Sequence, residues 1–534
     1  MSTDCLPYST IPHTSRLFAE YTSNHEAVRE FYPRPPFSRN WLAEEARTIR
    51  YDTERRQRVA DVLQRQNREW GASKATLESL ARFRAGAAAV VTGQQVGLFG
   101  GPLFSIYKAL TAIRLAVEES QAGADCIPIF WLATEDHDLA EVNHVTLLNA
   151  EGDLERIETS SRGGENAPVG SIRLGAEIEE AVRAASRVLG DSEACEFLRE
   201  SYRPGETLGG AFARLFSRLF RDSGIVLVDA SDPELHRIAE PVLRAAAVAA
   251  ADLDRALLER NKALEARGFH AQVKVTPEST LLFHLQGGAR LPVHRGNGGF
   301  QAGRQKMSPD ELAKRITEHP EEFSANVLLR PVVEDYLLPT VAYVGGPAEV
   351  AYFAQAAVVY EELLGRVTPV VPRFSATLVE PRIQRLLGRY QVGLADTFHG
   401  VEHLREALAK RCIPPDLAAH FDSASDALTA SLDAISASLK QLDPTLVAAA
   451  TKARSKMTHQ LERLRGRAAR AQLRRNQEIV RHAGQLNNSL YPHKALQERE
   501  IGGITYVARY GTGLLLRLYD AAQLGCAGHQ MINL

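Results

Sequence analysis

Cysteine is scarce in this sequence and follows no pattern. The 534 residues contain only five cysteines, an odd number, and no two of them have C-x-x-C spacing. Disulfide-rich secreted domains and zinc ribbons both require paired or closely spaced cysteines. The sequence therefore argues against both classes and predicts reduced thiols, as in a cytosolic protein. The five residues are Cys5, Cys126, Cys195, Cys412 and Cys526.

Long apolar runs are missing as well. No stretch reaches the ~18 apolar residues expected of a membrane-spanning helix. Residues 1–10 have neither the basic nor the apolar part of a signal peptide. The formal net charge of −2 gives no general attraction to nucleic acid or to an anionic membrane. We therefore expect a cytoplasmic protein with neither a membrane nor a nucleic acid as its partner.

The most informative stretch runs from residue 87 to residue 108. Small apolar residues at 87–91 predict a buried strand that breaks at Thr92-Gly93, and Pro102 suits the first turn of a following helix. A strand, a glycine-rich loop and a helix start expose backbone N–H groups to an anion in many α/β proteins. The candidate binding residues are Gly93, Gln94, Gln95, Gly97, Gly100 and Gly101.

The loop matches neither the P-loop nor the G-x-G-x-x-G pattern. Its two glutamines are neutral groups that could orient a carboxylate, a phosphate or a sugar hydroxyl. Lys108, two turns into the predicted helix, either reaches a phosphate or lies in solvent. The stretch thus indicates a ligand site without naming the ligand.

Ionisable residues crowd the end of the second predicted strand, residues 127–133. In a cleft, His137 could act as a general acid–base group, with Asp136 or Asp138 orienting its ring. A neighbouring carboxylate could bind an amine or a metal ion, and His144 is a further candidate ligand-binding residue. A solvated loop is the structural alternative. The spacing matches no known zinc signature, so we predict no metal.

Further apolar strands are predicted at residues 225–229, 341–345 and 367–372, each near a helical segment. This alternation favours a doubly wound parallel sheet. Residues 268–300 alternate in polarity and carry glycines, which indicates an antiparallel ribbon. Arg330 is either a carboxylate or phosphate clamp or part of a structural ion pair. Near the C-terminus, Tyr491 and Arg499 could line a second pocket.

The segment 378–488 has almost no strand signal. Apolar residues recur at steps of three and four from Leu428 to Leu442 and again from Leu446 to Ala471, on either side of Asp443-Pro444. Two such helices joined by a sharp turn predict an antiparallel coiled-coil hairpin. Ordinary helices packed on the core are the alternative.

Five sequence blocks together resemble the BshC family, the cysteine ligases of bacillithiol biosynthesis. They read TGQQVGLFGGPLFSIYKA, PIFWLATEDHDLAEVNHV, SANVLLRPVVEDYLLPTVAYVGGPAEVAYFAQ, VVPRFSATL and LYPHKALQER. The resemblance extends essentially from end to end. It implies an α/β fold: a Rossmann-like parallel-sheet core, similar to class I aminoacyl-tRNA synthetases, with insertions and a long α-helical coiled-coil arm that dimerises.

The resemblance also implies an activity. The enzyme would be a ligase that forms a carbon–nitrogen (amide) bond between L-cysteine and the amine of glucosaminyl-malate, the last step to bacillithiol. ATP or ADP is the nucleotide that it implies. Two other functions stay open on the residues alone: a non-catalytic nucleotide-binding scaffold with a coiled-coil interaction arm, and a metal-dependent hydrolase.

The expected organisation follows from these patterns and from the resemblance. N-terminal helices and the first half of the core occupy residues 1–150, and further core segments lie at 223–260 and 336–377. Connecting insertions are expected at 151–222 and 261–335, the second containing the ribbon. The arm spans 378–488, and residues 489–534 pack back on the core.

Overall fold

Five buried strands form a parallel sheet in the order β13-β12-β2-β3-β6. The chain runs outward from β2 to β3 and β6, then returns to the other side of β2 with β12 and β13. The strands are β2 (Ala88–Gln94), β3 (Cys126–Leu132), β6 (Val226–Asp229), β12 (Thr340–Gly345) and β13 (Val370–Pro372). This reversal of direction creates a topological switch point between β2 and β12, the place where open α/β sheets bind ligands.

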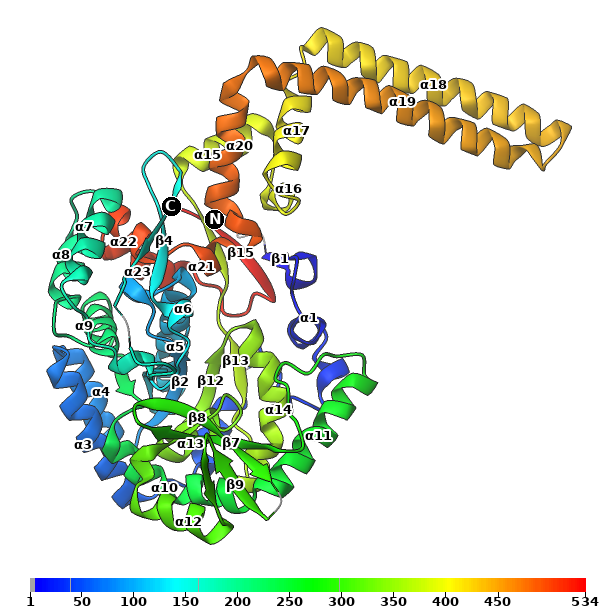
Figure 1. The fold of residues 1–534 in the computed structure, drawn as a ribbon. Coiled ribbons are helices and arrows are strands. Elements are labelled where there is room, and N and C mark those ends of the chain that lie inside the picture. Colours follow the sequence, from blue (N-terminus) through cyan, green and yellow to red (C-terminus); the bar gives the residue numbers. More distant parts are fainter. Residues whose placement is uncertain (1–4, 39, 162, 297) are drawn as a thin grey trace. The chain divides into compact units, whose positions relative to one another are not determined.

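The computed structural model describes residues 5–38, 40–161, 163–296 and 298–534 (Figure 1). The chain divides into two units, which we describe separately. The larger comprises Met1–Ala150, Leu154–Thr377 and Glu498–Ile532. The smaller comprises Glu151–Asp153, Leu378–Gln497 and Asn533–Leu534.

Helices surround the parallel sheet because its strands are apolar on both faces. Helix α5 (Leu103–Gln121) connects β2 to β3, with Pro102 as its N-cap, and α14 (Pro347–Leu364) connects β12 to β13. Asp232 caps α10 through the backbone N–H of Glu234. The other helices here are α1 (Arg16–Ser23), α2 (Leu42–Thr48), α3 (Thr53–Glu69), α4 (Lys74–Ala85), α10 (Pro233–Val248), α11 (Ala250–Ala266) and α13 (Arg330–Leu337).

The predicted strand break at Thr92-Gly93 is wrong. Both residues stay paired with β3, opposite Phe130 and Trp131, and the Thr92 hydroxyl donates to the Val344 carbonyl of β12 at 2.8 Å. Ladder hydrogen bonds on both sides of a central strand therefore carry β2 on to Gln94, past the threonine and the glycine.

A second sheet is antiparallel, in the order β10-β9-β8-β7-β11. It confirms the predicted ribbon. Its strands are β7 (Ser279–Gln286), β8 (Ala289–Gly296), β9 (Gly299–Ala302), β10 (Gln305–Met307) and β11 (Phe323–Ala325), with α12 (Pro309–Glu318) before β11.

The insertion after β3 contains one hairpin and several helices. These are α6 (Leu139–Val142), β4 (His144–Leu148), β5 (Leu154–Glu158), α7 (Glu177–Leu189), α8 (Glu193–Ser201) and α9 (Leu208–Leu219). Between β5 and α7, Val169–Ser171 form a 3-10 turn and Arg173 makes an isolated bridge with Thr207.

The two ends of the chain pair with each other. Strand β1 (Cys5–Pro7) lies antiparallel to β15 (Gly528–Asn533), in a sheet of order β1-β15-β14 with β14 at Ala376–Val379. A disulfide joins Cys5 to Cys526, with the Cα atoms 6.4 Å apart. The expectation of five reduced thiols is thus wrong for this pair. Spacing rules could not detect it because the residues lie 521 positions apart.

The smaller unit is helical, and its longest helices confirm the predicted hairpin. Helices α18 and α19 run antiparallel (Figure 1), Leu432 is buried, and Arg465 pairs with Asp422 across the hairpin at 2.9 Å. The helices of this unit are α15 (Pro381–Tyr390), α16 (Leu394–Thr397), α17 (Val401–Arg411), α18 (Pro415–Leu442), α19 (Leu446–Arg475) and α20 (Gln477–Leu490). Helices α21 (Gln497–Glu500), α22 (Ile504–Tyr510) and α23 (Gly513–Ala521) follow. No described helix is both long enough and apolar enough to cross a membrane.

Gly170→Ala should destabilise the larger unit. A Cβ at Gly170 would lie 2.3 Å from Cβ of Thr134, two residues after the end of β3, so one of the two backbones must move. We expect the free energy of unfolding to fall by about 1–3 kcal/mol, the usual cost of overpacking. Urea denaturation checks this. The control is Gly164→Ala, where the added Cβ meets no atom within 4 Å, and an equal loss in both variants would contradict the contact.

Candidate active site

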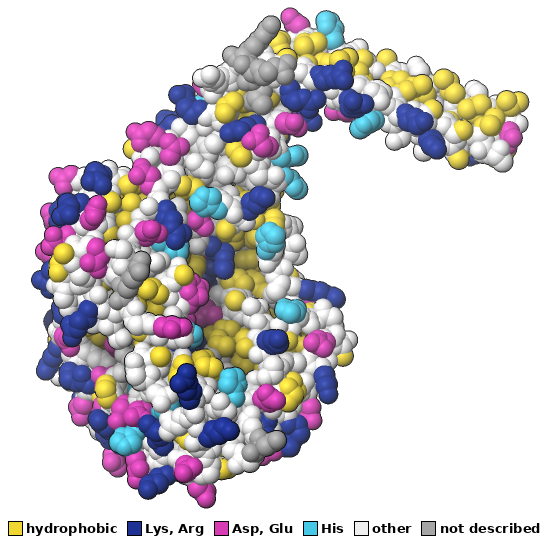
Figure 2. Space-filling model, viewed as in Figure 1, with side chains coloured by type: hydrophobic (Ala, Val, Ile, Leu, Met, Phe, Trp, Pro, Cys, Tyr) yellow, Lys and Arg dark blue, Asp and Glu magenta, His cyan; other side chains and the backbone are white. Residues whose placement is uncertain are grey.

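A cavity of about 650 Å³ opens at the carboxyl ends of β2, β3 and β12. In the space-filling view the surface is hollowed there (Figure 2). Gly93 and Gln94 lie opposite Trp131 and Leu132 in the sheet, so the loop after β2 and the acidic turn after β3 lie at one edge. Both segments therefore border a single crevice.

Lys108 is buried beneath the switch point, so the alternative of a solvent-exposed lysine is wrong. Its Nζ donates to the Gly93 carbonyl at 2.7 Å and to Oε1 of Gln94 at 2.9 Å, and it pairs with the Glu349 carboxylate. Burial lowers the pKa of Lys108 to about 8, although Glu349 opposes the shift. The ammonium therefore stays charged at neutral pH and ties α5 to the first turn of α14.

Arg330 lines the cavity from the start of α13. Its guanidinium donates to Glu334 at 3.1 Å and to the hydroxyls of Tyr352 at 2.6 Å and Tyr343 at 3.3 Å. Burial raises the pKa of Glu334 well above its ordinary value, which favours the neutral acid. Arg330 thus combines the two roles left open by the sequence: it forms a structural pair and still presents positive charge to the cavity.

Two more arginines gather around the ring of Phe104. Arg373 lies 5.3 Å from the ring centroid and Arg499 lies 5.9 Å from it. Arg373 pairs with the buried Glu498 at 2.7 Å, while no carboxylate of the described residues lies within ion-pair distance of Arg499. Burial and the nearby Arg373 lower the pKa of Arg499. This end of the cavity is therefore suited to an anionic ligand.

Acidic groups form a second cluster in the cavity, the acidic end, in which Asp136 lies 3.9 Å from Nη1 of Arg290 and Glu141 acts on the charge of Arg499. Nε2 of Gln95 donates to Asp136 at 2.6 Å and to Glu141 at 2.8 Å, so one neutral amide holds two carboxylates together. All three residues line the cavity. An amine or ammonium group would find its complement here.

Arg290 and Asp136 both lie beside the His137 ring. Nη1 of Arg290 lies 3.3 Å from Nδ1 of His137, and Oδ1 of Asp136 lies 3.7 Å from the same nitrogen. Asp136 also accepts a hydrogen bond from the backbone N–H of His137, while Asp138 caps α6. Asp136 is thus in place to orient the ring, whereas Asp138 serves as a helix cap.

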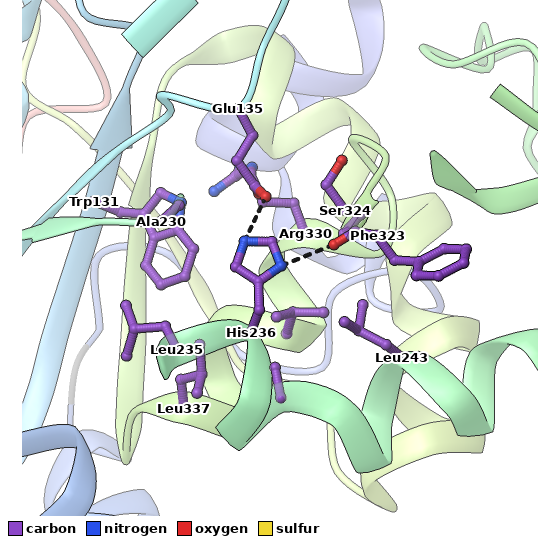
Figure 3. A pocket seen from close by; sticks show the side chains of 13 residues that line it. Trp131, Glu135, Ala230, Leu235, His236, Leu243, Phe323, Ser324, Arg330 and Leu337 are labelled. Atoms are coloured by element: carbon purple, nitrogen blue, oxygen red, sulfur yellow. Dashed lines mark hydrogen bonds and ion pairs between the residues drawn. The ribbon is translucent and has the colours of Figure 1, made fainter. Parts of the chain in front are cut away.

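Glu135 forms the closest acid–histidine pair at the site. Its Oε1 lies 3.0 Å from Nε2 of His236 on α10, and Nδ1 of His236 bonds the Phe323 carbonyl at 2.9 Å (Figure 3). Burial lowers the pKa of His236, but the Glu135 carboxylate and the carbonyl bonds outweigh it and raise the pKa above its ordinary value. His236 is thus a buried imidazolium that fixes the Glu135 side chain.

Several predicted residues lie away from the cavity. Gly97, Gly100 and Gly101 fold back instead of lining it: a Cβ at Gly97 would meet Cα of Gly101 at 3.0 Å, and a Cβ at Gly100 would lie 3.4 Å from the Phe216 side chain of α9. These glycines were the signal for an anion loop, and they lie outside the lining of this cavity. Gly93, Gln94 and Gln95 do line the cavity.

Asp138, His144 and Tyr491 are also outside the set of lining residues. His144 belongs to β4, where Nδ1 lies 3.2 Å from Oδ1 of Asn143. Tyr491 belongs to the smaller unit and packs its ring 4.8 Å from that of Phe398. Asp136, His137, Lys108, Arg330 and Arg499 are the other predicted residues that the structure brings together.

The sequence reasoning missed five residues that shape the site: His236, Arg290, Glu349, Tyr352 and Arg373. Glu349 could have been predicted from the sequence, because it follows Gly346-Pro347 at the end of a predicted strand. Arg290 was assigned to the ribbon surface. Among the described residues, no three His, Cys, Asp or Glu side chains group as metal ligands, so the geometry gives a metal-dependent hydrolase no support.

Comparison with known proteins agrees with this architecture. The family model "Bacillithiol biosynthesis BshC, N-terminal Rossmann-like domain" matches residues 1–374, and the BshC "C-terminal coiled-coil domain" matches residues 376–534. The chain belongs to the BshC family. Proteins named "Putative cysteine ligase BshC" from Koribacter versatilis and Solibacter usitatus are 49% and 37% identical, each match covering 100% of both chains.

A third BshC relative, from Salinibacter ruber, carries the same printed name. It is 33% identical, and the match covers 97% of this chain and 96% of that protein. The Rossmann-like core and the coiled-coil arm described above are therefore the two parts of a BshC protein, and the relatives support a ligase role.

Stability should depend on pH through the Glu135–His236 pair. A raised histidine pKa stabilises the fold at pH values below the ordinary 6.5, and this contribution is lost as pH rises through the raised value. Glu135→Gln should therefore cost about 2 kcal/mol near pH 6 and much less near pH 9. Urea unfolding at both pH values measures the difference in free energy of unfolding between the native protein and the variant. The control is the exposed Glu158→Gln, and a pH-independent difference for Glu135→Gln would contradict the pairing.

Proposed function

We propose that this protein joins the carboxyl group of L-cysteine to the amine of glucosaminyl-malate, the last step of bacillithiol biosynthesis. The observation that carries the proposal is the cavity lined by arginines and carboxylates at the switch point of a chain that matches the BshC family over its full length. Amide formation needs the carboxyl group of one substrate and the amine of the other to be held within reach of each other.

The cationic end would bind the malate part of the acceptor. Arg373 and Arg499 flank Phe104, and arginine suits carboxylates because its guanidinium can donate two parallel hydrogen bonds. The acidic end, with Asp136 and Glu141 held by Gln95, would receive the glucosamine amine. The two ends would thereby set the direction of the substrate in the cavity.

Joining a carboxylate to an amine releases water, so the carboxyl group must first be activated. We propose that ATP would supply this activation: a carboxylate oxygen of cysteine would attack a phosphorus atom of ATP and break a P–O bond, which releases ADP or pyrophosphate. The amine would then attack the acyl carbon and displace phosphate or AMP, respectively. The amine must be neutral to attack, and the carboxylates of the acidic end can accept its proton. An ATP-dependent enzyme of this kind would act in the cytoplasm.

The arm supports a second part of the proposal, a homodimer. Beside Leu417, four large apolar residues of the hairpin are exposed among its described side chains, although Leu432 is buried inside it. Exposed apolar side chains in a row along a long helix favour burial against another chain. We propose that two arms pack through these residues, which are Ile435, Leu442, Met457 and Leu464.

The ligase assay combines pure protein, glucosaminyl-malate, L-cysteine and ATP, with the thiol product followed by mass spectrometry. With the protein present, product should form only when glucosaminyl-malate, L-cysteine and ATP are all added. Arg499→Met should raise the KM for glucosaminyl-malate about tenfold or more, since a hydrogen bond to a charged group is lost. Arg517→Met, on the exposed side of α23, is the matched control. Absence of product with and without nucleotide would refute the function.

The dimer is tested by analytical ultracentrifugation. Ile435→Glu combined with Leu464→Glu should give monomers, because each buried apolar side chain contributes roughly 1.5–3 kcal/mol. Ala437→Glu places the same charge on α18 about half a turn away from Ile435 and should leave the dimer intact. A dimer that survives the double substitution would rule out this face of the arm as the interface.

A further inference from the structure

A second, much smaller cavity adjoins the large one. It measures about 20 Å³ and lies among α10, α13 and β11, beyond the end of β3. Trp131, Glu135, Ala230, Ala325 and Arg330 line both cavities, so the small one is a side pocket of the large one. A space of this size holds one water molecule or one group of similar size.

The walls of this side pocket are mostly apolar. Leu235, Ala239 and Leu243 of α10 face Val333 and Leu337 of α13, and all of them are buried. Figure 3 shows His236 in the middle of this group, below Glu135. A small, weakly polar group would be accepted here, whereas a hydroxyl would lose hydrogen bonds to water.

Two opposite charges stand where the side pocket meets the large cavity. Oε1 of Glu135 is held by His236, and within the described part of the chain Oε2 has no hydrogen-bond partner. Arg330 presents the positive charge described above. An α-amino acid carries an ammonium and a carboxylate on one carbon, so these two residues match its backbone groups, with the side chain entering the pocket.

We propose that the side pocket binds the cysteine substrate: the thiol fills the apolar space, Glu135 binds the α-ammonium, and Arg330 binds the α-carboxylate facing the large cavity. The inference rests on the proposed ligase function. It assigns cysteine selection to cavity size and polarity, since thiols behave as small, weakly hydrogen-bonding apolar groups. His236 is a positioning residue here, because both of its ring nitrogens are already bonded.

The first test changes the size of the pocket. Ala239→Val fills it and should raise the KM for cysteine at least tenfold, while Ala246→Val adds the same methyl groups to an equally buried site of α10 outside the pocket. Leu243→Ala enlarges it and should let L-homocysteine, rejected by the native protein, become a substrate. Serine should be used at least tenfold less well than cysteine.

The second test removes one backbone group of the ligand at a time. Isothermal titration should show native protein binding cysteine about tenfold more tightly than 3-mercaptopropionate, which lacks the amine, and this difference should vanish in Glu135→Gln. Cysteamine, which lacks the carboxylate, should likewise bind the native protein more weakly than cysteine does. In Arg330→Met this difference in affinity should vanish. Far-ultraviolet circular dichroism confirms that the variants are folded.

The outcomes separate the two proposals. If thiol product forms but Ala239→Val and Ala246→Val share the native KM for cysteine, the side pocket is not the cysteine site and the ligase function stands. If no product forms, yet cysteine binds and Ala239→Val weakens that binding, the pocket assignment stands and the function fails. Cysteine binding unchanged in Ala239→Val and Glu135→Gln overturns the pocket.

Discussion

The buried ammonium of Lys108 is the constraint on which the site depends. Removing an ammonium from water is costly unless several partners replace the water. Here Gly93 and Gln94 at the end of β2 and Glu349 at the start of α14 do so. The Lys108 ammonium thus fixes the distance between the end of β2 and the start of α14, which diverge at the switch point. Both segments contribute residues to the cavity wall.

Pairing of cations with internal carboxylates recurs around the cavity. Arg373 is balanced by Glu498 and Lys108 by Glu349, while Arg330 is held by its hydrogen bond to Glu334. Such pairs hold long side chains in one position before a ligand binds. Binding therefore costs the protein less conformational entropy. Arg499, which has no such partner among the described residues, has its charge available for a ligand.

The central sheet could be predicted because its strands are continuous apolar runs ending in glycine, proline or acids. The same reasoning put Gln94 and Asp136 directly after predicted strands. It could not place His236 at the site, because nothing in the sequence of a long helix shows that one of its histidines pairs with Glu135, about a hundred positions earlier. The glycines at 97, 100 and 101 misled because tight packing and anion binding both select glycine.

The pairing of β1 with β15 has a consequence for synthesis on the ribosome. Strand β1 is synthesised long before β15, the strand with which it pairs. Strand β15 also carries His529, whose ring forms hydrogen bonds with Ser375 and Thr377 beside Arg373. Burial lowers the pKa of His529 to about 4, so this neutral ring completes the polar support of the cationic end. A nascent chain therefore cannot assemble the finished site until β15 has left the exit tunnel.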